Sequence, residues 1–199
     1  DYENGICSYS IKKTKKVFLR KGIHFEFLFG ALPELKAQAK KRGDNIIRIL
    51  SAACSRGQEA YSLAMFLHTH LKDTETDFCI YGLDIDQESV SIAKNGVYPY
   101  DEVKTIPVKF LEGNWQRGTG EIEHFARIKE HLAKKCTFQS GNILHGALDK
   151  LVPEKKFDSV FCRNVLIYFS PEVKKQILQK IAACLQAGGI LFLGASESI

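Results

Sequence analysis

The chain has 199 residues, of which 45% are hydrophobic and 26% charged, the ordinary balance of one soluble domain or of one domain with a small insertion. No apolar run reaches the length of a membrane-spanning helix and the first residues do not form a signal peptide, so the sequence argues against membrane insertion and favours the cytoplasm. The formal net charge is +5, and several of the lysines occur in pairs scattered along the chain. Scattered pairs are typical of a solvated surface or of a protein with an acidic partner rather than of a nucleic-acid-binding protein.

Six cysteines are spread along the chain without a C-x-x-C pair. Zinc sites and disulfide frameworks normally show such close spacing, so the sequence predicts reduced thiols instead. The six histidines do not suggest a ligand set either, because His68 and His70 lie too close together to share one helix face. We therefore expect no metal site.

Apolar runs alternate with helical periodicities along most of the chain. Residues 1–22 are polar and lysine-rich and are interpreted as a linker or arm, followed by one domain over residues 23–199. The predicted elements are a helix over 24–42 that is either continuous or broken at Pro33, strand 46–50, helix 58–71, strand 78–83, helix 87–95, strand 157–162, helix 171–186 and strand 190–193. The last helix is expected to begin at Ser170-Pro171 and to end before Gly188-Gly189. This alternation predicts an α/β fold with a parallel sheet and right-handed crossovers.

Residues 99–145 interrupt the alternation with closely spaced prolines and glycines. The stretch EHFARIKEHLAKKCTFQSGNI contains hairpin-like strand patterns and one further core strand before Gly141. We interpret residues 114–136 as a small inserted antiparallel β-subdomain.

The stretch IIRILSAACSRGQEAYSLAM, from Ile46 to Met65, predicts a strand, a tight turn and a helix. Such a turn often binds a nucleotide through backbone N–H groups, yet this one contains neither G-x-G-x-x-G nor G-K-[ST]. Glu59 follows its single glycine by two residues and would repel a pyrophosphate but attract a cationic amine. The turn therefore favours S-adenosylmethionine over NAD or ATP, although Glu59 could also serve only as a first-turn acid of the helix.

A carboxylate at the end of the second strand of such a sheet usually accepts hydrogen bonds from two ribose hydroxyls. Asp84 has this position, so we expect it to bind a ribose. The other interpretation of an acid here is a helix N-cap, and Asp86 fits that role better because it directly precedes the helix 87–95.

The segment FDSVFCRNVLIYFSPE, residues 157–172, carries polar and aromatic residues directly after a buried strand. Asn164 offers a carbonyl and an amide, and Tyr168 a ring and a hydroxyl, where the reactive end of a ligand would lie. A simple turn with Tyr168 in the core is the alternative. Asn142 and Ile143 follow the preceding core strand and could flank an adenine or form only a turn.

Together these segments resemble the CheR-type chemoreceptor glutamate methyltransferases. The resemblance is carried by SAACSRGQEAYSLAM (51–65), LDID followed by AKNGVYP (83–99), WQRGTG (115–120) and FDSVFCRNVLIYF with the tail GGILFLGASES (157–198). It extends from about Thr14 to Ile199. It implies a Rossmann-like sheet that binds S-adenosylmethionine, with S-adenosylhomocysteine as the product, and a small inserted antiparallel β-subdomain.

The resemblance also implies roles for individual residues. Arg20, at the end of an aromatic segment upstream of the sheet, would lie by the cofactor and steer the substrate carboxylate, and Tyr168 would lie near the transferred methyl group. The remaining cofactor contacts would be Glu59 at the methionine amine, Asp84 at the ribose with Ile85 beside it, and Asn142, Ile143, Asn164 and Val165 around the adenosine.

The activity implied is the methylation of glutamate carboxylates of chemoreceptors, giving methyl esters in chemotaxis adaptation, with a receptor C-terminal peptide docked at the inserted subdomain in some members. Two alternatives stay open: a methyltransferase of the same fold with another protein or a small molecule as substrate, and a non-catalytic module that binds S-adenosylmethionine or a partner. The second alternative arises because Thr14 and Lys16 stand where family members usually carry Asn and Thr.

Overall fold

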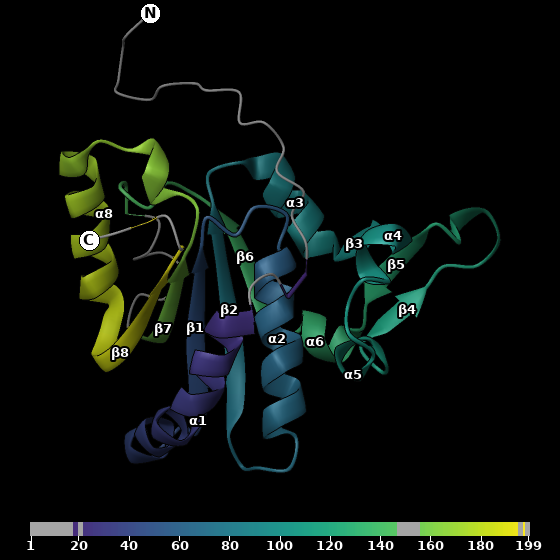
Figure 1. Ribbon diagram of the computed structural model, residues 1–199, viewed down its shortest axis with the longest axis horizontal. Helices are drawn as coiled ribbons and strands as arrows, with labels where there is room; N and C mark the ends of the chain where they lie inside the picture. Colours follow the sequence, from purple (N-terminus) through teal and green to yellow (C-terminus); the bar gives the residue numbers. More distant parts are fainter. Residues whose placement is uncertain (1–17, 20–21, 147–155, 195–196, 198–199) are drawn as a thin grey trace, which may run out of the picture.

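A five-stranded parallel sheet forms the centre of the protein (Figure 1). The computed structural model describes residues 18–19, 22–146, 156–194 and 197. The strands are β1 (Ile46–Ala52), β2 (Asp77–Asp84), β6 (Cys136–Ser140), β7 (Phe157–Cys162) and β8 (Leu185–Leu193), in the spatial order β6-β2-β1-β7-β8. All neighbouring pairs are parallel, which confirms the predicted α/β class.

The two most apolar strands lie at the centre of the sheet. Every residue of β7 is buried, as are the last six residues of β1. Because both faces of a parallel sheet are covered by helices, its central strands carry apolar residues without alternation. The segments that end in Ala52 and Cys162 are therefore mostly apolar, and their polar residues Arg48, Ser51, Asp158 and Ser159 are buried as well.

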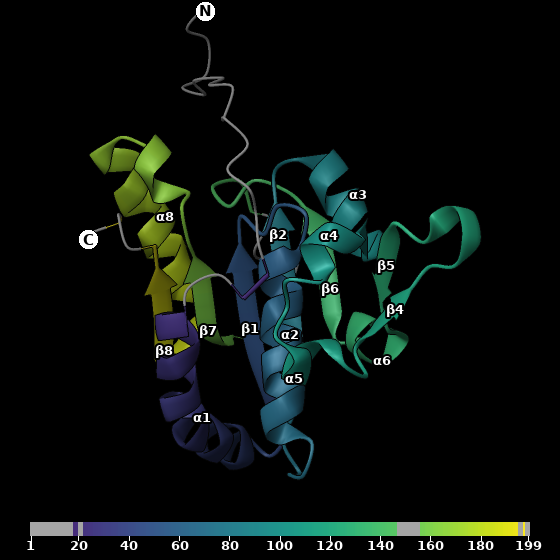
Figure 2. The ribbon, with the colours of Figure 1, turned by 45° about the vertical axis from the view of Figure 1, so that its right-hand side comes forward.

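Helices cover both faces of the sheet (Figures 1 and 2). On one face lie α1 (Gly22–Arg42), α2 (Gln58–Leu71) and α3 (Gln87–Asn95), whose buried side chains join Ile49 and Phe161 in one core cluster. On the other face α8 (Pro171–Cys184) buries Ile177 and Ile181 against Leu50 and Val160. Neighbouring residues of a strand therefore serve opposite cores.

Capping residues define the helix ends as the sequence predicted. The Asp86 side chain accepts hydrogen bonds from the N–H groups of Glu88 and Ser89, and Gly96 ends α3 with φ 62°. Ser170 caps α8 by accepting the N–H of Val173. The segment 24–42 forms one continuous helix through Pro33.

The predicted boundary between the last helix and the last strand is wrong. The helix α8 ends at Cys184, and β8 begins at Leu185 and includes the Gly188-Gly189 pair. Leu185 pairs with Phe157, whereas Ile190 pairs with Ser159, so the register shifts between these positions. Gly188, with φ 78°, lies in this irregularity of the strand, where a side chain would be strained.

A second, antiparallel sheet lies beside the main one, on the right of Figure 1. Its strands are β3 (Val97–Pro99), β5 (Phe125–Ile128) and β4 (Trp115–Arg117) in that spatial order, and its connections include α4 (Tyr100–Val103), α5 (Val108–Leu111), α6 (Glu130–Ala133) and the 3₁₀ turn η1 (Gly120–Ile122). Two of the three strands fall within residues 114–136, while β3 precedes that range. It stays a prediction that residues 114–136 form a subdomain in their own right. The predicted boundary between the arm and the domain, at residue 23, likewise stays a prediction.

Phe18 links the segment before α1 to this second sheet. Its buried ring packs edge-on against Tyr98 and Trp115, with 5.2 Å between ring centroids in both pairs.

None of the helices among the described residues has the length and apolar character needed to cross a membrane.

Candidate functional site at the carboxyl ends of the strands

The residues that follow four neighbouring strands meet along one edge of the main sheet. In the β1–β2 and β1–β7 ladders Ala52 lies opposite Leu83 and Cys162, and in the β2–β6 ladder Asp84 lies opposite Ser140. Since the strands are parallel, their carboxyl ends face the same side, which is where open α/β sheets bind ligands. The predicted site residues after these strands therefore lie on one edge.

Glu59 joins two of these strand ends. Its Oε1 accepts a hydrogen bond from the Ser51 hydroxyl at 2.8 Å, and its Oε2 lies 2.9 Å from Nη1 of Arg163. The Arg163 side chain is only 6% exposed and that of Glu59 21%. The first turn of α2 is therefore tied to the ends of both β1 and β7 by a largely buried carboxylate.

The turn between β1 and α2 has an unusual backbone. Ala53, Ser55 and Gly57 all have positive φ, at 59°, 50° and 85°. For a residue other than glycine this costs about 1–3 kcal/mol, so other contacts must hold the turn. The Ser55 N–H donates to Oδ2 of Asp84 at 2.5 Å, and the Cys54 N–H donates to the Leu83 carbonyl at 3.0 Å.

Asp84 and Asp86 make different contacts. Asp86 caps α3, as the sequence predicted. Asp84 accepts one backbone N–H on each oxygen, from Ser55 on Oδ2 and from Asp86 on Oδ1. A carboxylate oxygen can accept two hydrogen bonds, so Asp84 keeps capacity for the hydroxyl groups of a ligand. Its role as a ribose ligand stays a prediction.

The glycine of the turn, Gly57, is closely surrounded by side chains of other elements. A Cβ atom at Gly57 would lie 2.8 Å from the Cβ of Ala93 and 3.2 Å from the Tyr98 hydroxyl. Gly57 therefore permits α3 to pack closely against the start of α2, and its φ of 85° suits the left-handed N-cap of that helix.

The residues after β6 form a turn. Oδ1 of Asn142 accepts the N–H of Leu144 at 2.8 Å, and Ile143 packs partly buried against the core cluster of α8. At the end of β2, Ile85 is 62% exposed. Their contacts with an adenosine stay predictions.

The segment after β7 leads into the 3₁₀ helix η2 (Leu166–Tyr168). Asn164 has φ 57°, and Val165 packs partly buried beside the α8 core. Tyr168 is 53% exposed, so it is not a core residue, which was the alternative to a role in the site.

Arg20 lies outside the described residues. Its neighbour Leu19 donates its backbone N–H to the Ser62 hydroxyl at 2.9 Å. Ser62 follows Glu59 by three residues in α2, so the two side chains share one face of that helix. The chain just before Arg20 is therefore attached next to the helix that carries Glu59.

Three contributors to this edge were not predicted from sequence: Ser51, Arg163 and Glu197. Arg163 directly follows a buried strand, which is the signal that could have identified it. Glu197 accepts hydrogen bonds from the backbone N–H groups of Asn164, Val165 and Leu166. No periodicity in the sequence links these residues.

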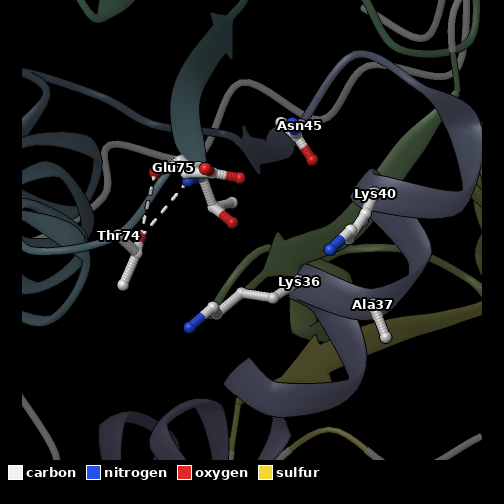
Figure 3. A pocket seen from close by; sticks show the side chains of 7 residues that line it. Lys36, Ala37, Lys40, Asn45, Thr74 and Glu75 are labelled. Atoms are coloured by element: carbon white, nitrogen blue, oxygen red, sulfur yellow. Dashed lines mark hydrogen bonds between the residues drawn. The ribbon is translucent and has the colours of Figure 1, made fainter.

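Cavities also lie away from this edge. One of about 260 Å³ is lined by Lys36 and Lys40 of α1 and by the segment Thr74–Thr76 (Figure 3). Because Thr76 precedes β2, this cavity lies at the amino ends of the strands, opposite Glu59 and Asp84.

In the part of the chain that the structure describes, no three His, Cys, Asp or Glu side chains are grouped so as to hold a metal ion.

Residues 14–199 match the protein family described as CheR methyltransferase, SAM binding domain. Among curated proteins, the chemotaxis protein methyltransferase of Escherichia coli is 34% identical over 95% of this chain and 62% of its own length. Chemotaxis protein methyltransferase 1 of Pseudomonas aeruginosa is 38% identical over 84% of this chain and 60% of its own. The chain thus spans less than two thirds of the length of these relatives.

Among solved structures, PKMT2 from Rickettsia typhi in complex with AdoHcy matches 75% of this chain and 21% of its own, with 18% identity and a TM-score of 0.46. That likeness is too weak to support an inference about fold or function.

Proposed function

Because the chain belongs to the CheR methyltransferase family, and matches its S-adenosylmethionine-binding domain, we propose that it methylates glutamate side chains of chemoreceptors. The product would be a glutamyl methyl ester, and the released cofactor S-adenosylhomocysteine. The observation that carries this proposal is the pair of carboxylates, Glu59 and Asp84, on either side of the β1–α2 turn.

The residues of this edge fit such a cofactor. Asp84 has hydrogen-bonding capacity for a ribose, and the Glu59 carboxylate, which also pairs with Arg163, would accept hydrogen bonds from the methionine ammonium. Ile143 and Val165 offer partly buried apolar surface for the adenosine, with Ile85, Asn142 and Asn164 next to them. A phosphate-bearing cofactor fits less well, because Asp84 would repel it and the charge of Arg163 is already balanced by Glu59.

The protein's own groups have a limited chemical task. Bound S-adenosylmethionine would supply an electrophilic methyl group, whose bond to sulfur would break as its bond to a substrate carboxylate oxygen forms, with S-adenosylhomocysteine as the neutral thioether leaving group. A glutamate carboxylate is already ionised near neutral pH, so the protein needs no general base. In our proposal Arg20 orients the substrate carboxylate and Tyr168 lines the space beside the methyl group, and both help to exclude water.

The proposed partner is the cytoplasmic part of a chemoreceptor, which places the enzyme in the cytoplasm. Its basic surface suits acidic receptor segments. The second sheet could in addition bind a receptor C-terminal peptide, since its outer strands β3 and β4 are edges to which an extended peptide can add. Ile122 in η1 and Phe125 on the middle strand β5 are exposed apolar side chains that such a peptide could contact.

The test is transfer of a radiolabelled methyl group from S-adenosylmethionine to a purified receptor cytoplasmic fragment. We expect label that base releases as methanol, because an ester is alkali-labile. A receptor fragment with glutamine at its methylation sites is the matched control and should take up no label. Label that is stable to base would identify another kind of acceptor atom. Cofactor binding without transfer would favour a non-catalytic binding module.

A further inference from the structure

The carboxylate of Glu197 accepts four backbone hydrogen bonds. Its Oε1 binds the N–H groups of Val165 and Leu166, at 2.8 and 2.7 Å, and its Oε2 binds those of Asn164 and Gly194, at 2.9 and 2.6 Å. Two bonds on each oxygen use the full accepting capacity of an ionised carboxylate. A single side chain therefore joins the continuation of β8 to the segment that follows β7.

Gly194 is required for this arrangement. A Cβ atom at Gly194 would lie 2.5 Å from Oε2 of Glu197 and 3.1 Å from the backbone nitrogen of Asn164. The Glu197 N–H in turn donates to the Gly194 carbonyl at 2.9 Å, so these two residues are also joined through their backbones. The glycine and the glutamate thus act as one unit, called here the Gly194–Glu197 clamp.

The segment that the clamp holds has little support of its own. Asn164 has φ 57°, in the left-handed region that glycine, and to a lesser extent asparagine and aspartate, adopts more readily than other residues. The helix η2 begins at Leu166, and its N-cap residue Val165 makes no side-chain capping hydrogen bond, so its first N–H groups need an acceptor from elsewhere. Glu197 provides that acceptor with a charged group, which makes the hydrogen bonds stronger than neutral ones.

The same segment bears three residues of the proposed cofactor site: Asn164 and Val165 beside the adenosine, and Tyr168 beside the methyl group. It also follows directly after Arg163, which binds Glu59. A shift of this segment would therefore move both the adenosine contacts and the partner of Glu59.

We propose that Glu197 is a positioning residue for cofactor binding, a role that rests on the proposed function. Its carboxylate holds residues 164–166 in the conformation that the cofactor requires, without contacting the cofactor itself.

The first variant to test is Glu197→Gln, which keeps the shape of the side chain. It removes the charge and turns an NH₂ group toward backbone N–H donors, so it breaks at least half of the clamp. Glu197→Asp keeps the charge but shortens the reach, and Gly194→Ala disturbs the clamp from its other side. Glu112→Gln, an exposed glutamate after α5, is the matched control.

Two measurements are needed on each variant. The first is the Kd for S-adenosylhomocysteine by calorimetry, which we expect to weaken about tenfold or more in Glu197→Gln and Gly194→Ala and not in Glu112→Gln. The second is amide hydrogen exchange of the protein without ligand. Exchange at residues 164–166 should accelerate about tenfold or more, while exchange in α2 and in the central strands stays as in the wild type.

Each outcome has a distinct meaning. Faster exchange at 164–166 with an unchanged Kd would overturn the positioning role and leave Glu197 as a structural tie. Faster exchange throughout the protein in all three variants would likewise overturn it, since the effect would be general loss of stability. A wild-type protein that does not bind S-adenosylhomocysteine would overturn the proposed function itself. Local acceleration together with weaker binding supports the proposal.

Discussion

The guanidinium of Arg163 and the carboxylate of Glu59 form an ion pair, with 2.9 Å between Nη1 and Oε2, although 104 residues separate them in the chain. The pair connects the end of β7 to the first turn of α2, across the end of β1. Both side chains are largely buried, so their interaction is screened less than that of a surface pair.

We expect Arg163 and Glu59 to be energetically coupled. A double-mutant cycle with Arg163→Met and Glu59→Gln should give a coupling free energy of about 1–2 kcal/mol in urea denaturation, because each single change leaves the other group buried without its charged partner. The exposed pair Lys134 and Glu130, changed in the same way, should show no measurable coupling. Additive effects of the Arg163 and Glu59 changes would contradict this expectation.

The two neighbouring aspartates should separate binding from folding. Asp84→Asn is expected to weaken the affinity for S-adenosylhomocysteine about tenfold or more, because an amide can accept only on its one oxygen. Asp86→Ala should instead cost about 0.5–2 kcal/mol of stability through loss of the α3 cap, with an unchanged Kd. Calorimetry and thermal unfolding of the two variants provide the comparison. Wild-type affinity in Asp84→Asn would remove Asp84 from the cofactor site.

Arg20 should matter more for transfer than for binding. In Arg20→Ala we expect the Kd for the cofactor to weaken at most partly while kcat for methyl transfer collapses, because the substrate carboxylate loses the cation that orients it. Lys41→Ala removes an exposed cation at the end of α1 and should leave both quantities unchanged. Unchanged turnover in Arg20→Ala would exclude Arg20 from the mechanism.

At the opposite end of the sheet, Arg42 stabilises a fully buried carboxylate. Its guanidinium binds both oxygens of Asp158, at 2.6 and 3.0 Å, and the Asp158 side chain is 0% exposed. Arg42→Met should cost about 2–4 kcal/mol in urea denaturation, since it leaves that charge without its ion-pair partner. Arg42→Lys should recover only part of the loss, because an ammonium cannot form the paired contact. The Kd for S-adenosylhomocysteine should stay as in the wild type, and a marked change would contradict the separation of the two ends.

Mild acid should destabilise the packing around His131. Its pKa lies below the ordinary value of 6.5, because of burial and then of the neighbouring His68 and Lys129. The unfolded chain therefore binds the proton more readily than the folded protein, so the stabilising contribution is present above pH 6.5 and is lost as pH falls through the folded pKa. Urea denaturation at neutral pH and at about pH 5 should show a larger loss in the wild type than in His131→Gln. Equal losses would exclude His131 as a source of this pH dependence.

The order of strands and helices could be predicted from the sequence because each element carries a local signal. The apolar runs ending at Ala52 and Cys162, the Asp86 cap and the Ser170-Pro171 pair all depend on residues within one element. The boundary at Leu185 could not be predicted. The strand begins there because Leu185 pairs with Phe157, and the local sequence carries no signal for that pairing. The strand Val97–Pro99 was missed for the same reason, because so short a segment is a strand only through its pairing with β5.

In the candidate site too, the residues with a local sequence signal could be predicted and those that depend on distant contacts could not. Glu59, Asp84 and Asn164 could be selected from sequence, because each is a polar residue directly after an apolar run or its turn. The steric constraint on Gly57 could not be predicted from the local sequence, since the atoms that exclude a side chain there belong to Ala93 and Tyr98, about 40 residues away.

By itself, then, the sequence determined the fold class and the family to which the chain belongs, because these depend on local periodicity and on contiguous motifs. It also predicted a ligand site at the carboxyl ends of the strands. Only the tertiary structure decided that Arg163 binds Glu59 and that Glu197 holds residues 164–166. These are contacts between the ends of neighbouring strands. Their partners become adjacent only when the strand order β1-β7-β8 is established, and that order depends on the packing of the whole sheet between its two layers of helices.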